Sequence, residues 1–203
     1  MEWYEAEVQE LEKLNKTTPP PAGAVLFYGS SSLRLWTTLT EDMAPWAVVN
    51  RAFGGSTLAA CVHFFDRLVV PCAPRSLVLY AGDNDLGDGR APDDVVRSLR
   101  ALLARVDTTL GSIPVAYVSI KPSPARWSLR DKIQRVNGAA RALIEQRPSG
   151  YYIDVYASML GPGGQPCAEL FDTDGLHLSP RGYRTWTHIL RPYVAILAGA
   201  PQE

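Results

Sequence analysis

The sequence predicts an α/β domain in which a parallel sheet carries helices on both faces. Short apolar segments bounded by turn residues alternate with segments of helical periodicity, and this alternation occurs five times along the chain. Right-handed crossovers through helices would bring such strands into one sheet. A chain of 203 residues is long enough to bury this core, so we expect one domain over residues 1–203.

The first part of the chain predicts a leading helix. Apolar residues from Tyr4 to Leu14 recur at helical spacing in an otherwise charged segment, which ends in the breaker-rich run TTPPPAG. Residues 1–23 are therefore expected to form this helix and a stiff, proline-rich connector. The core of the domain is expected over residues 24–198.

Five apolar runs are predicted to be the strands of the sheet. Each is short, continuous and bounded by turn residues, as is typical of strands buried on both faces. They are AVLFY at 24–28, WAVVN at 46–50, SLVLYA at 76–81, PVAYVSI at 114–120 and YYIDVY at 151–156.

Helices are predicted between and after these strands, from apolar residues that recur at helical spacing. Pro92 and Pro180 stand where a first helical turn tolerates proline. The predicted helices cover residues 58–69, 95–110, 129–144 and 179–197.

Composition excludes several classes of partner. The chain has 20 Lys and Arg against 21 Asp and Glu, so no net field draws it to nucleic acid or to an anionic membrane. The cysteines Cys61, Cys72 and Cys167 show no metal-ligand spacing, and we expect no metal site.

The acidic first residues lack the features of a secretory signal, and no apolar run approaches the roughly 20 residues that cross a bilayer. We expect a soluble, cytoplasmic protein with a small-molecule partner and no membrane insertion.

Chemically useful side chains follow the predicted strands. The carboxyl ends of parallel strands meet at one crevice, where ligands bind. Three consecutive serines, Ser30 to Ser32, follow the first strand, glycines follow the second, and GDND follows the third. After the fifth strand a longer excursion reaches Asp172, Asp174 and His177.

These residue types fit an acyl-transfer site. A serine hydroxyl needs an adjacent base, which the imidazole of His177 can supply. Asp174 lies three residues before His177 and can orient the ring, with Asp172 as the alternative. Gly55 and Asn84 can supply N–H donors to an oxyanion.

Four short segments together resemble the four sequence blocks of the SGNH (GDSL-type) hydrolases in order and spacing. They are Gly29-Ser30-Ser31, Gly55 within NRAFGGS, Asn84 within GDND, and Asp174 with His177 within DGLH. The resemblance covers about residues 24 to 190. It implies a flavodoxin-like three-layer α/β/α fold and ester hydrolysis through a Ser-His-Asp triad, with no cofactor.

Carried over by position, the resemblance implies that Ser31 is the nucleophile, His177 the base and Asp174 its orienting carboxylate. It further implies an oxyanion hole made by the backbone N–H of Ser31, Gly55 and Asn84. The family usually has aspartate at the position of Ser30.

Further residues are candidates for binding the substrate. Lys121 and Arg126, within KPSPARW, follow the fourth strand and are expected at the rim of the same crevice. Arg34 on the first short helical segment is a third candidate. A small ester, such as a lipid or an acetylated sugar, is the expected substrate, with a short acyl chain.

Two other functions share parts of this pattern. A non-catalytic, flavodoxin-like module could hold a phosphate or flavin, with the serine loop as the anion cradle. That alternative explains the serines but leaves His177, Asn84 and Asp174 without a role. An acyltransferase would use the same triad with a sugar hydroxyl in place of water.

Overall fold

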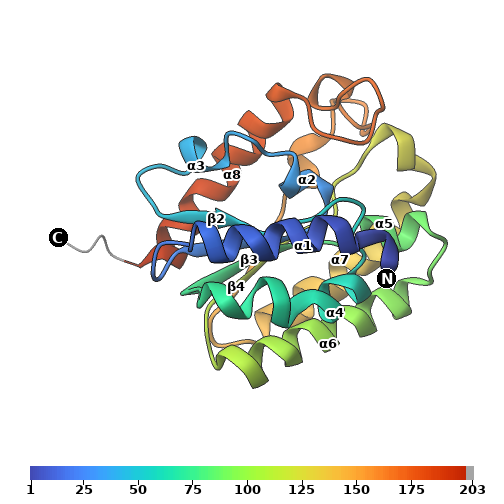
Figure 1. The fold of residues 1–203 in the computed structure, drawn as a ribbon. Helices are drawn as coiled ribbons and strands as arrows, with labels where there is room; N and C mark the ends of the chain where they lie inside the picture. The colour runs from blue at the N-terminus through green and yellow to red at the C-terminus, as the bar shows by residue number, and fades with distance from the viewer. Residues whose placement is uncertain (200–203) are drawn as a thin grey trace.

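The computed structural model describes residues 1–199 and has a five-stranded parallel sheet between two layers of helices (Figure 1). The strand order is β2-β1-β3-β4-β5, and every neighbouring pair is parallel. The predicted fold class is thereby confirmed. Residues 200–203, the end of the predicted domain, lie outside the described residues.

The strands coincide with the five predicted apolar runs, although several are shorter. Residues at the predicted ends of the second, fourth and fifth runs belong to the connecting loops instead. The strands are β1 (Val25–Gly29), β2 (Val48–Asn50), β3 (Ser76–Tyr80), β4 (Val115–Val118) and β5 (Gly150–Ile153).

The helices divide between the two faces of the sheet. One face is covered by α1 (Glu2–Thr17), α4 (Leu58–Leu68), α6 (Pro92–Leu110) and α7 (Arg130–Glu145). The other face is covered by α8 (Pro180–Ala198) with the short helices α2 (Ser31–Arg34) and α3 (Leu39–Asp42). A further short helix, α5 (Asp83–Gly87), follows β3. The short helical segment expected around Arg34 is α2, whereas the sequence pattern did not predict α3 or α5. Short 3₁₀ turns cover residues 70–72, 124–129, 157–159 and 168–170.

The alternation of side chains along each strand builds two hydrophobic layers. In β1, Leu26 and Tyr28 belong to the layer under α4 and α6, whereas Val25 and Phe27 belong to the layer under α8. All these side chains are buried, which is why the run has no polar residue.

Local signals set the beginnings of the long helices. The Thr57 side chain accepts a hydrogen bond from the backbone N–H of Ala60 and caps α4. Ser179 caps α8 in the same way through Gly182, with Pro180 in the first turn. No helix within residues 1–199 is both long and apolar enough to span a membrane.

The strand order places a topological switch point between β1 and β3. The connection after β1 leads to β2 at one edge of the sheet, and the chain then crosses back to β3 on the other side of β1. The connections that leave β1 and β3 therefore run in opposite directions along the sheet. The loops after β1 and β3 therefore border a crevice at the carboxyl edge of the sheet.

Two glycines let these loops turn sharply. Gly29 has φ +142°, and a Cβ there would lie 1.9 Å from the carbonyl oxygen of Tyr80, so the backbones of β1 and β3 touch at this point. Gly82 has φ +116° at the start of α5. Any larger residue at position 29 would push Ser30 and Ser31 away from the end of β3.

Candidate active site

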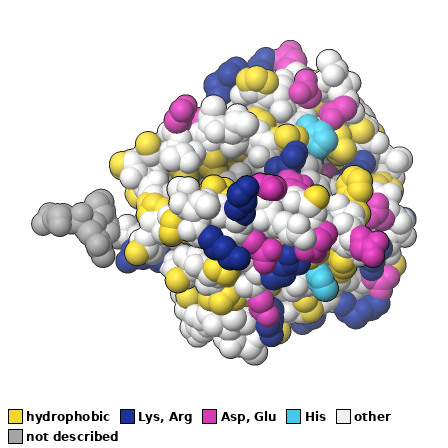
Figure 2. All heavy atoms as spheres, in the orientation of Figure 1, with side chains coloured by type: hydrophobic (Ala, Val, Ile, Leu, Met, Phe, Trp, Pro, Cys, Tyr) yellow, Lys and Arg dark blue, Asp and Glu magenta, His cyan; other side chains and the backbone are white. Residues whose placement is uncertain are grey.

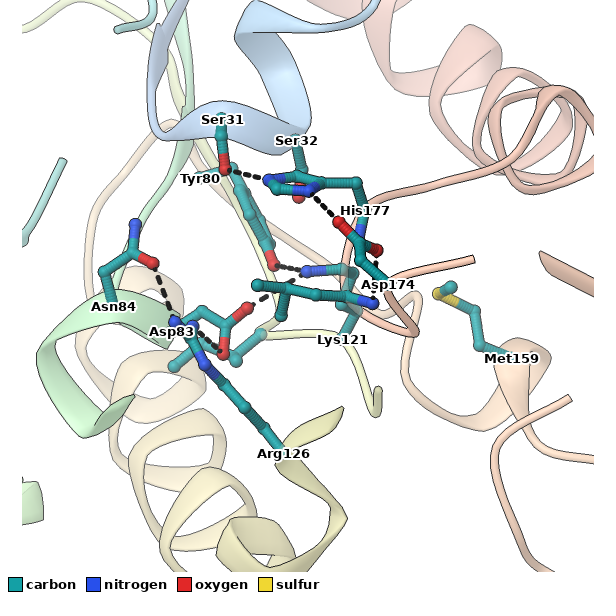
Figure 3. Close-up of polar contacts among 12 residues, drawn as sticks. Ser31, Ser32, Tyr80, Asp83, Asn84, Lys121, Arg126, Met159, Asp174 and His177 are labelled. Carbon is teal, nitrogen blue, oxygen red and sulfur yellow. Dashed lines mark hydrogen bonds and ion pairs between the residues drawn. The ribbon is translucent and has the colours of Figure 1, made fainter. Parts of the chain in front are cut away.

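A serine, a histidine and an aspartate form a continuous hydrogen-bonded chain at the carboxyl edge of the sheet (Figure 3). The Oγ of Ser31, the first residue of α2, lies 3.0 Å from Nε2 of His177. Nδ1 of His177 lies 2.5 Å from Oδ2 of Asp174. The structure thus brings together three side chains that the sequence separates by up to 146 positions.

The loop that carries Asp174 and His177 is a tight turn closed by its own backbone. The N–H of Asp172 donates to the carbonyl of His177, and Gly175 takes φ +65° inside the turn. The other carboxylate oxygen of Asp174 accepts the backbone N–H groups of Leu176 and His177. Within residues 1–199, the carboxylate of Asp172 accepts only from the N–H of Thr173, so Asp174 is the carboxylate that contacts the imidazole.

These contacts keep Asp174 ionised. Hydrogen bonds from the N–H of Leu176 and from His177 lower the pKa of the Asp174 carboxyl to about 2. Because the folded-state pKa lies below the ordinary value near 3.9, the ionised carboxylate stabilises the fold above about pH 4. That contribution is lost as the pH falls from about 4 toward 2.

We therefore expect Asp174→Asn to lose stability in a pH-dependent way. Its urea midpoint should lie below that of the unmodified protein at pH 6, and the gap should narrow as the pH falls below about 4. Asp172→Asn is the matched control, because that carboxylate lies in the same loop and does not touch His177. A gap that stays constant down to the acid-unfolding limit would show that the contacts of Asp174 do not depend on its charge.

The three predicted oxyanion donors face one cavity. This cavity has a volume of about 480 Å³, and Ser31, Gly55, Asn84 and His177 line it. Among the described residues, no carbonyl or side-chain acceptor takes the backbone N–H of Ser31 or of Gly55. Both N–H groups are therefore available to an incoming oxygen.

The leading helix α1, which sequence reasoning had left without a role, forms a wall of the cavity. The Glu7 carboxylate accepts the N–H of Gly54 at 2.9 Å and pairs with Arg34. The Tyr4 hydroxyl donates to the carbonyl of Gly55 at 3.2 Å. Helix α1 thus fixes the glycine turn from the side opposite the sheet, and nothing local in its sequence signals this docking.

Ion pairs join the acidic helix α1 to α4. The Arg67 guanidinium on α4 bridges Glu5 and Glu12 of α1, each at 2.7 Å. Figure 2 shows acidic and basic side chains interspersed across this face of the molecule. Helix α1 is therefore held by ion pairs on its outer side and by the contacts of Tyr4 and Glu7 near the cavity.

The three candidate substrate-binding residues occupy different positions. Arg34 lines the cavity but is paired with Glu7. Lys121 is only 1% exposed and does not line the cavity, which corrects its predicted place at the rim. Arg126 does not line the cavity either, which corrects its predicted place at the rim; it donates to the side-chain oxygen of Asn84 at 3.1 Å.

Lys121 and Arg126 both pair with Asp83, a contact that sequence reasoning missed. The ammonium of Lys121 lies 3.0 Å from one carboxylate oxygen, and the guanidinium of Arg126 lies 2.8 Å from the other (Figure 3). Burial by itself raises the pKa of the Asp83 carboxyl, but the two cations outweigh it and lower this pKa. Burial by itself lowers the pKa of Lys121, but Asp83 and Tyr80 outweigh it and raise that pKa. The only feature of the sequence that could have indicated these ion pairs is that an acidic residue follows β3 and two basic residues follow the adjacent strand β4.

The sequence profile of the GDSL-like Lipase/Acylhydrolase family matches residues 22–185. The chain belongs to this family. The predicted resemblance is thereby confirmed, and membership supports a hydrolase activity for this GDSL-type chain. No curated protein matches it.

Solved structures of low sequence identity share the fold. A protein from Streptococcus pneumonia, provisionally named a platelet activating factor, is 22% identical with a TM-score of 0.85, over 95% of this chain and 92% of that one. A GDSL-like lipase from Bacteroides thetaiotaomicron is 19% identical with a TM-score of 0.79, over 93% and 97%. A carbohydrate esterase of family 3 from Talaromyces cellulolyticus is 17% identical with a TM-score of 0.68, over 86% and 97%.

Proposed function

We propose that this GDSL-type hydrolase cleaves a carboxylic ester of short acyl chain, with Ser31 as nucleophile. The observation that carries the proposal is the Ser31–His177–Asp174 chain of contacts, with distances of 3.0 Å and 2.5 Å. A serine within hydrogen-bonding reach of an imidazole, itself oriented by a carboxylate, is the arrangement that nucleophilic acyl transfer needs.

The reaction proceeds in two halves. Ser31 Oγ attacks the ester carbonyl carbon while His177 Nε2 takes the hydroxyl proton, and Asp174 stabilises the imidazolium that forms. The tetrahedral intermediate collapses as the imidazolium gives its proton to the leaving alcohol, which leaves an acyl group on Ser31. Water then attacks the acyl-enzyme with His177 as base, and the acid leaves with Ser31 restored.

The oxyanion would be held by N–H donors of residues that line the cavity before substrate arrives. The backbone N–H groups of Ser31 and Gly55 have no acceptor among residues 1–199, and the Asn84 amide lines the same cavity. Donors already in place stabilise charge in the transition state without reorganising. Loss of one such donor typically costs about 10²- to 10³-fold in kcat.

The electrostatics of the crevice disfavour the alternative of a phosphate- or flavin-binding module. Among the described residues that line the cavity, the only lysine or arginine is Arg34, which Glu7 neutralises. Lys121 and Arg126, the cations behind these strands, do not line the cavity and both pair with Asp83. An anion cradle would need uncompensated positive charge facing the ligand.

The cavity favours a short acyl group. Its volume of about 480 Å³ falls in the range of small-molecule sites, and Glu7 and Arg34 belong to its wall. Covering these charged groups with a long alkyl chain would remove them from water at a cost in free energy.

Ester profiling tests the proposal. We expect hydrolysis of p-nitrophenyl acetate and butyrate, and a kcat/KM that falls for the octanoate and dodecanoate. A maximum at dodecanoate would contradict the short-chain assignment, and no hydrolysis of any ester or acetylated sugar would contradict the proposed activity. Added alcohols or sugars distinguish the acyltransferase, because transfer yields a new ester where hydrolysis yields only free acid.

A further inference from the structure

The Asn84 side chain is held in one orientation by two hydrogen bonds. Its Oδ1 accepts from the Arg126 guanidinium at 3.1 Å, and its Nδ2 donates to the carbonyl of Ser56 at 3.1 Å. A guanidinium has only donors, so the amide atom that faces Arg126 must be the oxygen. The NH₂ group is thereby turned away from Arg126, and one N–H remains after the bond to Ser56.

We propose that Arg126 is a positioning residue, which keeps that remaining N–H of Asn84 directed at the oxyanion site. This inference rests on the proposed function, because it takes Asn84 as an oxyanion donor. Arg126 itself does not line the cavity and does not touch the reacting atoms. Figure 3 shows the contact between the Arg126 guanidinium and the Asn84 amide, through which its effect on catalysis would pass.

The buried carboxylate of Asp83 fixes the guanidinium. Asp83 immediately precedes Asn84 in α5 and is 3% exposed. Its Oδ1 lies 2.8 Å from Arg126 Nη1, while Nη2 of the same guanidinium reaches Asn84. One planar group therefore joins two consecutive residues, which the single ammonium of a lysine cannot do with the same geometry.

Lys121 completes the support from the other side of Asp83. Its Nζ lies 3.0 Å from Asp83 Oδ2 and 3.2 Å from the Tyr80 hydroxyl. The Asp83 carboxylate is thus compensated by a second buried cation and cannot follow Arg126 if the guanidinium moves. The cluster of Asp83, Lys121 and Arg126 is a rigid base beneath the amide.

Gly87 at the end of α5 provides the space that this arrangement needs. A Cβ at position 87 would lie 2.8 Å from the guanidinium carbon of Arg126, closer than atoms pack. The φ of Gly87 is not positive, so alanine suits its backbone. Gly87→Ala therefore displaces the Arg126 guanidinium while the charge that faces Asp83 is kept.

A double-mutant cycle on p-nitrophenyl acetate tests the inference. We expect Arg126→Met to lower kcat about 10- to 100-fold with KM within about twofold, since a misplaced donor weakens only transition-state contacts. In the Asn84→Ala background the same change should have no further effect on kcat. Arg126→Lys should restore part of the loss, and Gly87→Ala should lower kcat in the same Asn84-dependent way.

The outcomes separate this inference from the proposed function. Arg130→Met is the matched control, because that exposed arginine adjoins the same loop but contacts Asp131 and the Trp127 ring rather than Asp83 or Asn84; it should keep the full kcat. If Asn84→Ala lowers kcat but Arg126→Met does not, or if their effects multiply, the positioning role is wrong. If Asn84→Ala itself keeps full kcat, the oxyanion assignment fails and this inference fails with it. If Arg126→Met does not fold, kcat of Gly87→Ala and of Arg126→Lys, each measured with and without Asn84→Ala, tests the positioning role instead.

Discussion

Ser31→Ala should lower kcat for p-nitrophenyl acetate by about 10⁴-fold or more, because in the proposed mechanism the acyl-enzyme forms on the Ser31 hydroxyl. The hydroxyl that is lost makes one hydrogen bond, to His177, and lies at the cavity rather than in the core. The melting temperature should therefore stay close to that of the unmodified protein. Steady-state kinetics and thermal unfolding of the purified variant measure both quantities.

The adjacent serines supply the controls for this prediction. Ser30 and Ser32 are 2% and 1% exposed, so their side chains are covered by the fold. Ser30→Ala and Ser32→Ala should keep most of the kcat. If Ser31→Ala still hydrolyses the ester at an undiminished rate while Ser30→Ala or Ser32→Ala is inactive, the nucleophile is that neighbouring serine and not Ser31.

His177→Ala should also lower kcat by about 10⁴-fold or more, since the serine hydroxyl is a weak nucleophile without a base. Because the hydroxyl of Ser31 remains, added imidazole can enter the vacated space and restore part of the rate. The acyl-enzyme should form and decay slowly in this variant. Stopped-flow and steady-state measurements with and without imidazole test these expectations.

The chain has three histidines, and the other two are matched controls. His63 on α4 and His188 on α8 are exposed, and neither is among the described residues that line the cavity. His63→Ala and His188→Ala should retain full activity. If His177→Ala kept full activity as well, the base would have to be another group.

The fold was predictable because the strands are buried on both faces. A run such as VLFY in β1 has no polar residue, and both hydrophobic layers of the structure draw on it. The strand ends were harder to place, because Trp46 and Ala47 precede the first ladder contact of β2, and Val155 and Tyr156 follow the last ladder contact of β5. The short helices α3 and α5 have fewer than two turns, too few to show periodicity.

The positions of the candidate triad could be predicted because parallel strands end at one edge. Ser31 follows β1 and Asn84 follows β3, the two strands at the switch point, so topology alone brings them together. The alternative orienter, Asp172, could be separated from Asp174 only by the backbone of the turn. Spacing along the chain does not specify which of two loop carboxylates faces a ring.

The residues that hold the candidate site in place could not be predicted from the sequence. Lys121 and Arg126 follow β4 and were expected to face the substrate, but the carboxylate of Asp83 draws both inward. A charged side chain that follows a strand can face solvent or form a buried ion pair beneath the loop. The sequence is the same in both cases, so it does not distinguish them. Helix α1 reaches the glycine turn through Tyr4 and Glu7, contacts that depend on tertiary docking.

The most direct test of the account is the site of covalent labelling by a fluorophosphonate. Such a reagent reacts with a serine only where a base activates the hydroxyl and N–H donors hold the phosphonyl oxygen. Mass spectrometry of the digested protein should find one adduct per chain, on Ser31, and none in His177→Ala over the same interval. An adduct on another residue, or none on a protein that hydrolyses p-nitrophenyl acetate, would contradict the proposed mechanism.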